Sequence, residues 1–406
     1  MRILIVSQYY WPEEFRINSV AKTLRKNGLD VTVLTGKPNY PHGRIFRGYF
    51  TWGCQKEIHE DIPIYRIPLI PRGRGGWRLS INYLSFIISG LIFSPWQLRR
   101  KSFDVIFIYG VSPILQAIPA IFLGWWKKCP RVLWVQDLWP ESLSATGYVK
   151  NKRIIKFVEL AVRYIYRSVE LLLVQSQAFS EPVRGMAGKV PIKYFPNSVD
   201  SNFAVPATSK PPDVLGLNAV FSVMFAGNIG SAQAVEVIVE AATRLKEYPD
   251  IQFVVLGDGS SRAWMLQQVK VCGLTNLHLP GRFPGEAMPG FMQKASALLV
   301  TLANREIFAA TVPNKVQAYM AAGRPIIACL PGEGARLVAE AKAGVCVPAE
   351  DGKALADAVL RLSQMTQEER DKMGRNGRAY FQKHFDHQML VSKLIEYFKE
   401  VRGGKL

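Results

Sequence analysis

The sequence predicts an α/β fold made of two doubly wound domains. Short apolar runs, such as residues 3–6 and 105–108, alternate with helical stretches along the chain. This alternation indicates a parallel sheet with helices on both faces. A stretch rich in Pro, Ser and Thr at residues 195–212 interrupts the alternation, and a second series begins at residue 222. The length of 406 residues fits two domains of ~100–200 residues each.

The linker sets the expected domain boundaries. We expect an N-terminal domain at residues 1–200, a C-terminal domain at residues 201–380, and a C-terminal helix at residues 381–406 that packs back on the N-terminal domain. An amphipathic helix at residues 17–27 follows the first strand and ends at Gly28. Further strands of the first domain are expected at residues 31–34, 64–67, 105–108, 132–135 and 171–174, and those of the second at 222–225, 252–256, 277–279, 297–301, 325–329 and 344–347.

Composition and charge exclude several classes of protein. With 49% hydrophobic and 20% charged residues, the chain can bury a sizeable core and is not a disordered polymer. The five cysteines show no CxxC spacing and the five histidines no HxxxH spacing. We therefore expect no disulfide framework, no protein-bound metal and a reducing compartment, the cytoplasm. The net charge is +19, and residues 1–200 carry most of it, with 28 Lys and Arg against 13 Asp and Glu.

An uncharged segment at residues 79–98 is long enough to span a membrane. Asn82, four serines and Pro95 weaken that interpretation, and the strand expected at 105–108 follows directly. The alternatives are a packing helix of the domain and a helix that dips into one leaflet. In the second case basic residues would contact anionic headgroups, and we favour this peripheral attachment. Those basic residues are Arg72, Arg74, Arg78, Arg99, Arg100 and Lys101.

Three glycine turns follow strands of the second domain, where open α/β sheets bind ligands. The first, with Gly227, Asn228 and Gly230, precedes a helix, so its backbone amides can bind an anion. It lacks the GxGxxG spacing of a dinucleotide site. The second turn contains Gly257 and Asp258, and the third contains Arg282, whose planar guanidinium suits a diphosphate. The alternatives are turns that only pack the domain and a solvated arginine.

A helix that opens with Pro313-Asn314-Lys315 is the most informative feature of the second domain. A cation in the first turn of a helix opposes the helix dipole. An anionic ligand held between Lys315 and the helix amides would explain its position. The helix ends at Gly323, and Pro325 leads the chain into a buried strand.

Two loops of the first domain place carboxylates and aromatic side chains at the carboxyl ends of strands. The loop at residues 8–18 carries Glu13 and Glu14, and the loop at residues 134–142 carries Asp137. We predict these three carboxylates as catalytic candidates. Helix capping is the alternative role for each of them.

Several stretches, in order along the chain, resemble the family 4 glycosyltransferases of the GT-B fold. The resemblance covers essentially the whole chain. Within the family, the sequence is similar to the L-fucosamine (N-acetylfucosamine) transferases of O-antigen and capsule assembly. The stretches that carry it are Tyr10-Trp11-Pro12-Glu13 through Asn18, Leu34 through Pro41, Gln136-Asp137-Leu138-Trp139-Pro140-Glu141-Ser142, Gly227-Asn228-Ile229-Gly230 and Pro313-Asn314-Lys315 through Pro325.

The resemblance implies two Rossmann-like domains facing a central cleft, a nucleotide-sugar donor on the C-terminal domain and an acceptor on the N-terminal one. It also implies transfer with retention and without an essential metal or other cofactor. Carried over to this sequence, the donor residues are Gly227, Asn228, Gly230, Gln233, Gly257, Asp258, Arg282, Glu306, Lys315 and Gln317. The acceptor residues are Arg16, Asn18, Tyr40, Trp139 and Glu141.

The sequence departs from the commoner family pattern at four positions. The usual E-x7-E glutamates would fall at Ala310 and Ala318, and Glu306 or Gln317 is left to bind the ribose. The usual basic pair of the first glycine turn would fall at Asn228 and Gln233, which are neutral.

The function expected from these features is transfer of a deoxyamino sugar, N-acetyl-L-fucosamine from UDP, to a polyprenyl-diphosphate-linked saccharide. The enzyme is expected on the cytoplasmic face of the membrane, bound through the basic first half of the chain. A UDP-sugar 2-epimerase of the same fold is the nearest alternative. A binder of nucleic acid or another polyanion would also explain the charge, but no recognised reading motif is present.

Overall fold

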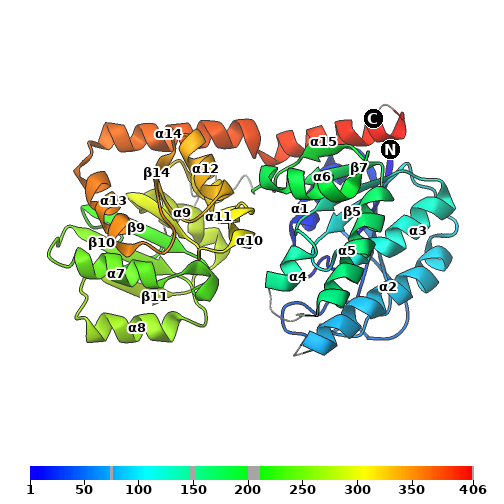
Figure 1. Ribbon diagram of the computed structural model, residues 1–406, viewed down its shortest axis with the longest axis horizontal. Coiled ribbons are helices and arrows are strands. Elements are labelled where there is room, and N and C mark those ends of the chain that lie inside the picture. Colours follow the sequence, from blue (N-terminus) through cyan, green and yellow to red (C-terminus); the bar gives the residue numbers. More distant parts are fainter. Residues whose placement is uncertain (74–75, 146–150, 200–210, 405–406) are drawn as a thin grey trace. The chain divides into compact units, whose positions relative to one another are not determined.

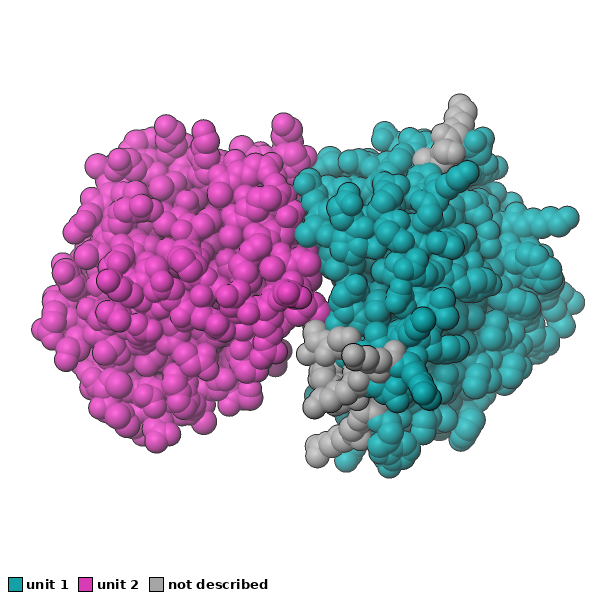
Figure 2. All heavy atoms as spheres, viewed as in Figure 1, with its two compact units in different colours: residues 1–197, 388–406 teal, residues 198–387 magenta. Residues whose placement is uncertain are grey.

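A computed structural model of the protein describes residues 1–73, 76–145, 151–199 and 211–404 (Figure 1). The chain forms two compact units: unit 1 comprises residues 1–197 and 388–406, and unit 2 comprises residues 198–387 (Figure 2). The boundary expected at residue 200 thus falls at residue 197, and the C-terminal segment of unit 1 starts at residue 388 rather than 381. Arg74 lies outside the described residues.

Unit 1 is built on an eight-stranded sheet in the order β3-β4-β2-β1-β5-β6-β7-β8. All neighbouring strands are parallel except β3 and β4, which form an antiparallel pair. The strands are β1 Arg2–Val6, β2 Asp30–Thr35, β3 Gln55–His59, β4 Ile62–Arg66, β5 Val105–Gly110, β6 Arg131–Val135, β7 Leu171–Val174 and β8 Ile192–Tyr194. The helices are α1 Arg16–Lys26, α2 Gly76–Leu98, α3 Ala117–Lys127, α4 Glu141–Ala145, α5 Lys152–Arg167, α6 Ser180–Ala187 and α15 His387–Arg402.

One face of this sheet is covered by α1 and by the C-terminal helix α15. Phe107 and Trp134 of the strands share a core cluster with Ile17 of α1 and Phe398 of α15. The Asp104 carboxylate at the start of β5 lies 3.7 Å from the Arg402 guanidinium, which ties the end of α15 to the sheet. Strand residues that point the other way are also buried, and α3 contacts β5 and β6. Helices therefore cover both faces, as the sequence predicts.

The uncharged segment forms α2, which packs against α3. It is the one described helix long and apolar enough to cross a membrane. Its inner face is fixed to unit 1 by polar bonds, because the buried Asn82 side chain accepts from Gln8 Nε2 at 2.8 Å and donates to the Ile70 carbonyl at 2.6 Å. These contacts pack the inner face of α2 against the rest of unit 1.

Unit 2 has a six-stranded, all-parallel sheet in the order β11-β10-β9-β12-β13-β14. Two core clusters sandwich it: Met224 and Leu298 belong to one, and Phe225 and Leu299 to the other. The strands are β9 Phe221–Ala226, β10 Ile251–Leu256, β11 Leu277–Gly281, β12 Ala297–Thr301, β13 Ile326–Cys329 and β14 Gly344–Val347. The helices are α7 Glu236–Arg244, α8 Arg262–Val271, α9 Met288–Lys294, α10 Glu306–Ala309, α11 Asn314–Ala322, α12 Glu333–Glu340, α13 Gly352–Gln364 and α14 Gln367–His384.

Candidate functional site

The loops that carry the first domain's candidate residues lie at one edge of the unit 1 sheet. β2, β1, β5 and β6 are neighbours and parallel, so their carboxyl ends meet at the same edge. Residues 7–15 follow β1, residues 36–41 follow β2, and residues 136–140 follow β6. The structure thus brings together the loops that the sequence singled out.

Glu13 joins two of these loops instead of facing an open surface. The side chain is 2% exposed, and its Oε1 accepts from the backbone N–H groups of Asn39 at 2.8 Å and Tyr40 at 2.7 Å. Its Oε2 accepts from the Tyr10 N–H at 3.3 Å. Burial raises the pKa of Glu13 to about 7, against the opposing effect of these N–H donors. We therefore reassign Glu13 from a catalytic to a positioning role.

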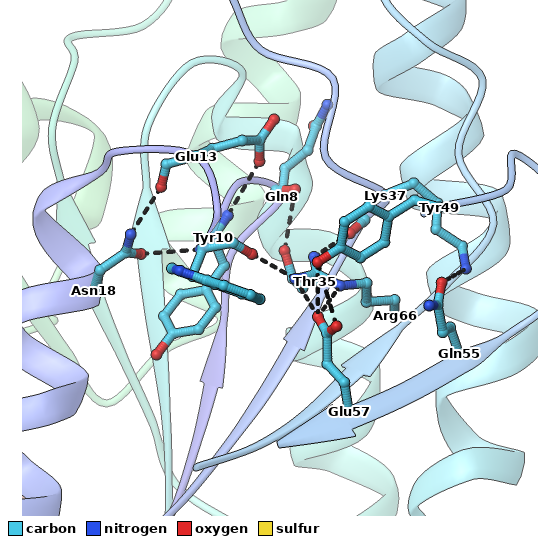
Figure 3. Close-up of polar contacts among 12 residues, drawn as sticks. Gln8, Tyr10, Glu13, Asn18, Thr35, Lys37, Tyr49, Gln55, Glu57 and Arg66 are labelled. Carbon is cyan, nitrogen blue, oxygen red and sulfur yellow. Dashed lines mark hydrogen bonds and ion pairs between the residues drawn. The ribbon is translucent and has the colours of Figure 1, made fainter. Parts of the chain in front are cut away.

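A buried arginine holds the same loops from the other side (Figure 3). Arg66 of β4 is fully buried and pairs with Glu57 of β3, while its Nη1 donates to the Gly36 carbonyl at 3.1 Å and its Nη2 to the Trp11 carbonyl. Beside it, the buried Lys37 Nζ donates to Gln55 Oε1 at 3.0 Å. The β3–β4 hairpin thereby fixes the loops after β1 and β2. The sequence did not predict β3, and so it did not reveal this network.

Asp137 occupies the edge where β5 and β6 end. Its Oδ2 accepts from the Ser112 backbone N–H at 3.0 Å and from the Ser112 hydroxyl at 2.8 Å, which leaves Oδ1 outside these bonds. Trp139 Nε1 donates to the same hydroxyl at 3.2 Å. Besides burial, the charge of Asp137 raises the pKa of Tyr109, whereas Arg16 lowers it. Asp137 and Trp139 thus share the Ser112 hydroxyl, and Tyr109 lies within reach of the charges of both Asp137 and Arg16.

The remaining residues predicted for the first domain divide into two groups. Tyr40 belongs to an aromatic cluster in which Tyr9 stacks on Phe15 at 5.1 Å between ring centroids, and Arg72 lies over the Tyr40 ring at 5.2 Å. Asn18 supports the loop, since it donates to the Glu13 carbonyl at 2.7 Å. Glu14 and Glu141 are exposed, and neither side chain hydrogen-bonds to another of the described residues. Glu141 lies in the first turn of α4, as a capping role requires.

In unit 2, the glycine turns after β9 and β10 pack directly on each other. A Cβ at Gly257 would lie 1.8 Å from the Gly227 carbonyl oxygen, and one at Gly259 would lie 2.3 Å from the Ile229 carbonyl oxygen. Only glycine permits this approach. Asp258 Oδ1 accepts from the Gly259 N–H at 2.8 Å, so this side chain supports its own turn.

Lys315 extends from α11 along the first of these turns. Its Nζ lies 3.7 Å from the centroid of the Phe225 ring, and a Cβ at Gly227 would lie 2.9 Å from the same Nζ. Burial lowers the pKa of Lys315 to about 7, and among the described residues no carboxylate forms an ion pair with it. One turn later on α11, the Tyr319 hydroxyl accepts from the Ala226 N–H at 3.2 Å. The arrangement is a cation without a counterion beside backbone amides, which suits an anionic ligand.

The other donor candidates differ in placement. Asn228 Nδ2 donates to Gln233 Oε1 at 2.9 Å, so the two neutral residues that replace the usual basic pair bond to each other. Gln317 is 1% exposed, and its Oε1 has no hydrogen-bond partner among the described residues. Arg282 and Glu306 are exposed. A polar groove of about 360 Å³, lined in part by Ser231, opens beside the first turn.

Two family models match successive parts of the chain. Residues 14–198 match the glycosyl transferase 4-like domain, and residues 221–365 match the glycosyl transferases group 1. Together they cover most of both units, and they support a glycosyltransferase rather than an epimerase or a nucleic-acid binder.

Individual proteins agree with this assignment. A protein of Escherichia coli K12 named "Putative colanic acid biosynthesis glycosyl transferase WcaI" is 25% identical over 342 residues, which cover 80% of this chain and 82% of that protein. Sucrose-phosphate synthase from Thermosynechococcus elongatus superposes with a TM-score of 0.74 at 15% identity over 99% of both chains. Anabaena HepE in complex with UDP superposes with a TM-score of 0.71 at 15% identity, over 98% of this chain and 100% of that one. The chain belongs to the family 4 glycosyltransferases and has the GT-B fold.

Proposed function

We propose that the enzyme transfers a deoxyamino sugar from a UDP donor to a lipid-linked saccharide during assembly of an O-antigen or capsular polysaccharide. N-acetyl-L-fucosamine is the proposed sugar, on the resemblance described above. Polysaccharide assembly is supported by the name of the E. coli relative, and a UDP donor by the UDP complex of the Anabaena protein.

The observation that carries the donor site is Lys315, a partly buried cation beside the first glycine turn, with no carboxylate to neutralise it among the described residues. A nucleoside diphosphate supplies the missing negative charge. The Gly227 and Ile229 N–H groups already donate to carbonyls at the end of β10 and in the turn that follows it. The first-turn amides of α11 and the amides of Asn228 and Gly230 would therefore share that charge with Lys315. We propose that Gln317 Oε1 accepts from a ribose hydroxyl, which would satisfy its unpaired oxygen.

In the proposed reaction, an acceptor hydroxyl oxygen forms a bond to the anomeric carbon while the bond from that carbon to the diphosphate oxygen breaks. The electron pair leaves with UDP, and the hydroxyl proton leaves with it or passes to solvent. Positive charge develops on the sugar ring and negative charge on the diphosphate, so Lys315 acts where charge grows in the transition state. We propose that this removes the need for a metal ion, and that the anomeric configuration is retained.

The proposed acceptor side is the edge formed by Asp137, Ser112 and Trp139. The two Ser112 donors fix one carboxylate oxygen of Asp137, so the other can orient a sugar hydroxyl. Arg16 and Tyr40 contribute a cation and an aromatic ring at the same edge. The cytoplasmic face of the membrane is the proposed location, because a lipid-linked acceptor is presented there.

A nucleotide screen tests the donor proposal. Thermal unfolding of the full chain is measured with UDP, GDP and dTDP, and UDP is expected to raise the midpoint most. UDP-deoxyamino sugars are then compared for transfer to a lipid-linked saccharide. No shift with any of the three nucleotides at millimolar concentration would contradict the donor site.

The Asp137→Asn variant tests the acceptor side. Asparagine keeps an oxygen that can accept from Ser112 but loses the charge, so transfer is expected to fall by at least about tenfold while UDP affinity is unchanged. The exposed Glu181 provides a matched control, and Glu181→Gln is expected to keep wild-type transfer. An Asp137→Asn enzyme with wild-type kcat and KM for acceptor would remove Asp137 from the site.

A further inference from the structure

The outward faces of α2, α3 and α5 in unit 1 carry large apolar side chains in regular rows. On α2 the row repeats every three or four residues, which is the spacing of one helical face. Its members are Trp77, Ile81, Leu84, Ile88, Ile92 and Trp96, with exposed fractions between 37% and 66%. The opposite face of α2 holds Asn82, Phe86 and Ser94, which are fully buried in unit 1. Water therefore meets the apolar side of this helix.

A second apolar row lies on α5, which the sequence did not single out. Ile154, Phe157, Leu160 and Tyr164 are between 48% and 72% exposed. The inward face of the same helix contains Val162 and Ile165, which are buried in unit 1. The exposed row therefore plays no part in packing α5 against its own unit. Exposed apolar residues that are scattered singly need no explanation, whereas aligned rows indicate an interaction surface.

The third helix joins the two rows into one surface. α3 contacts both α2 and α5 (Figure 1). A groove of about 460 Å³ is lined by Leu91 of α2, Phe122 and Trp125 of α3, and Tyr164 of α5. Trp125 is 70% exposed at its rim. We call the exposed rows of α2 and α5, together with this groove, the three-helix face.

The charges around the three-helix face are almost all positive. α2 and α3 contain no acidic residue, and the one acidic residue of α5, Glu159, is paired with Arg163 at 2.7 Å. Tryptophans stand beside cations at the helix ends: Arg78 lies over Trp77, Arg99 over Trp96 and Lys127 over Trp126, at 4.5 to 5.9 Å. Beyond the end of α2, an open groove of about 510 Å³ is lined by the basic residues Lys56, Arg99, Arg100 and Lys101.

We propose that the three-helix face docks on the surface of an anionic lipid bilayer, with α2 and α5 lying in the interface and neither helix crossing it. Apolar rows bordered by Trp, Arg and Lys match the boundary between acyl chains and anionic headgroups. The groove between the helices accommodates part of an acyl chain. A protein partner would need an apolar surface bordered by acidic residues that match the basic border of this face. An anionic bilayer supplies both the apolar acyl chains and the negative charge. The choice of a lipid partner rests on the lipid-linked acceptor of the proposed function.

Vesicle co-sedimentation of the full chain tests this proposal. Vesicles of phosphatidylglycerol and phosphatidylcholine are expected to bind the protein, and vesicles of phosphatidylcholine alone to bind it much less. Replacing Phe157 and Leu160 together by Ser, or Ile88 and Ile92 together by Ser, is expected to weaken partitioning by about tenfold or more, because each pair removes apolar area from the interface. Arg153 and Lys156 are exposed basic residues of α5 beside its apolar row, and replacing both by Glu is expected to reduce binding to the anionic vesicles specifically.

The control is a pair of highly exposed apolar residues in unit 2. Val220 and Val271 are 76% and 71% exposed, and replacing both by Ser is expected to leave vesicle binding unchanged. Circular dichroism and the UDP-induced thermal shift report whether each variant is folded. The proposal would be overturned if the α2 double variant and the α5 double variant both bound anionic vesicles as well as the wild-type protein does. A second result would also overturn it: the wild-type protein forms a stable dimer in light scattering, the Phe157 and Leu160 double variant is a monomer, and vesicles bind neither protein. The three-helix face would then join two copies of the chain.

Vesicle binding does not require a donor or an acceptor, so the two proposals fail separately. Binding to anionic vesicles without sugar transfer would leave the three-helix face in place and contradict the proposed function. Sugar transfer without any vesicle binding would support the proposed function and contradict the docking role of the three-helix face.

Discussion

Replacing Lys315 by Met is expected to lower kcat/KM for the UDP-sugar by about a hundredfold to a thousandfold, the range seen when one preorganised charge stabiliser is lost. Methionine fills a similar volume over the Phe225 ring, so the fold is expected to survive. The measurement is initial-rate kinetics with varied donor, together with UDP affinity by calorimetry. Lys270, exposed in the last turn of α8, provides the control, and Lys270→Met is expected to keep wild-type values.

The same lysine gives UDP binding a defined pH dependence. Burial lowers the pKa of Lys315 to about 7, so the amine is charged below pH 7 and neutral above it in the free enzyme. A bound diphosphate favours the charged form, and binding above pH 7 must therefore take up a proton. UDP affinity is expected to fall by up to about tenfold per pH unit from pH 7 to pH 9. In Lys315→Arg, which stays charged, the dependence is expected to disappear. A flat profile in the wild-type enzyme would show that Lys315 does not face the diphosphate.

Replacing Arg66 by Met is expected to destabilise unit 1 by about 3–5 kcal/mol, because the Glu57 carboxylate and the Gly36 and Trp11 carbonyls lose their shared donor. The loops after β1 and β2 are expected to loosen with it, so acceptor KM should rise while UDP affinity stays unchanged. Hydrogen exchange of residues 8–15 and 36–41, with chemical unfolding of the full chain, measures both effects.

Arg163 offers a matched comparison on the surface of the same unit. It pairs with Glu159, and both side chains are more than a third exposed. Arg163→Met is expected to cost no more than about 1 kcal/mol, since exposed ion pairs contribute little. Equal costs for the Arg66 and Arg163 variants would contradict the role given to the buried network.

The sequence predicted the architecture because the buried strands are continuous apolar runs. β1, β5, β6 and β9 are buried along almost their whole length, and each stands out as an uninterrupted hydrophobic segment. β3 was missed because it is an edge strand whose residues alternate between partly buried and exposed positions, with Lys56 and Glu57 in its middle.

The sequence could predict a site residue only where the type of residue was unusual for its position in a helix or after a strand. Lys315 opposed a helix dipole, and Asp137 followed a buried strand, so both were visible in the sequence. Ser112 and Tyr319 are ordinary residue types whose roles depend on which strand ends lie side by side. The assignment of Glu13 failed for a related reason: three backbone N–H groups from two loops surround its carboxylate, and no local pattern announces them.

The return of α15 to unit 1 affects the order in which the protein can fold during synthesis. Val391, Leu394 and Phe398 belong to the same core as Phe107 and Trp134, although more than 250 residues separate them. All of unit 2 lies between these two parts of the core. Unit 2 is complete in a continuous stretch and can fold as soon as it leaves the ribosome. In unit 1, α1 can cover its part of the sheet face early, but the part that packs against Leu394 and Phe398 stays exposed until α15 has been made.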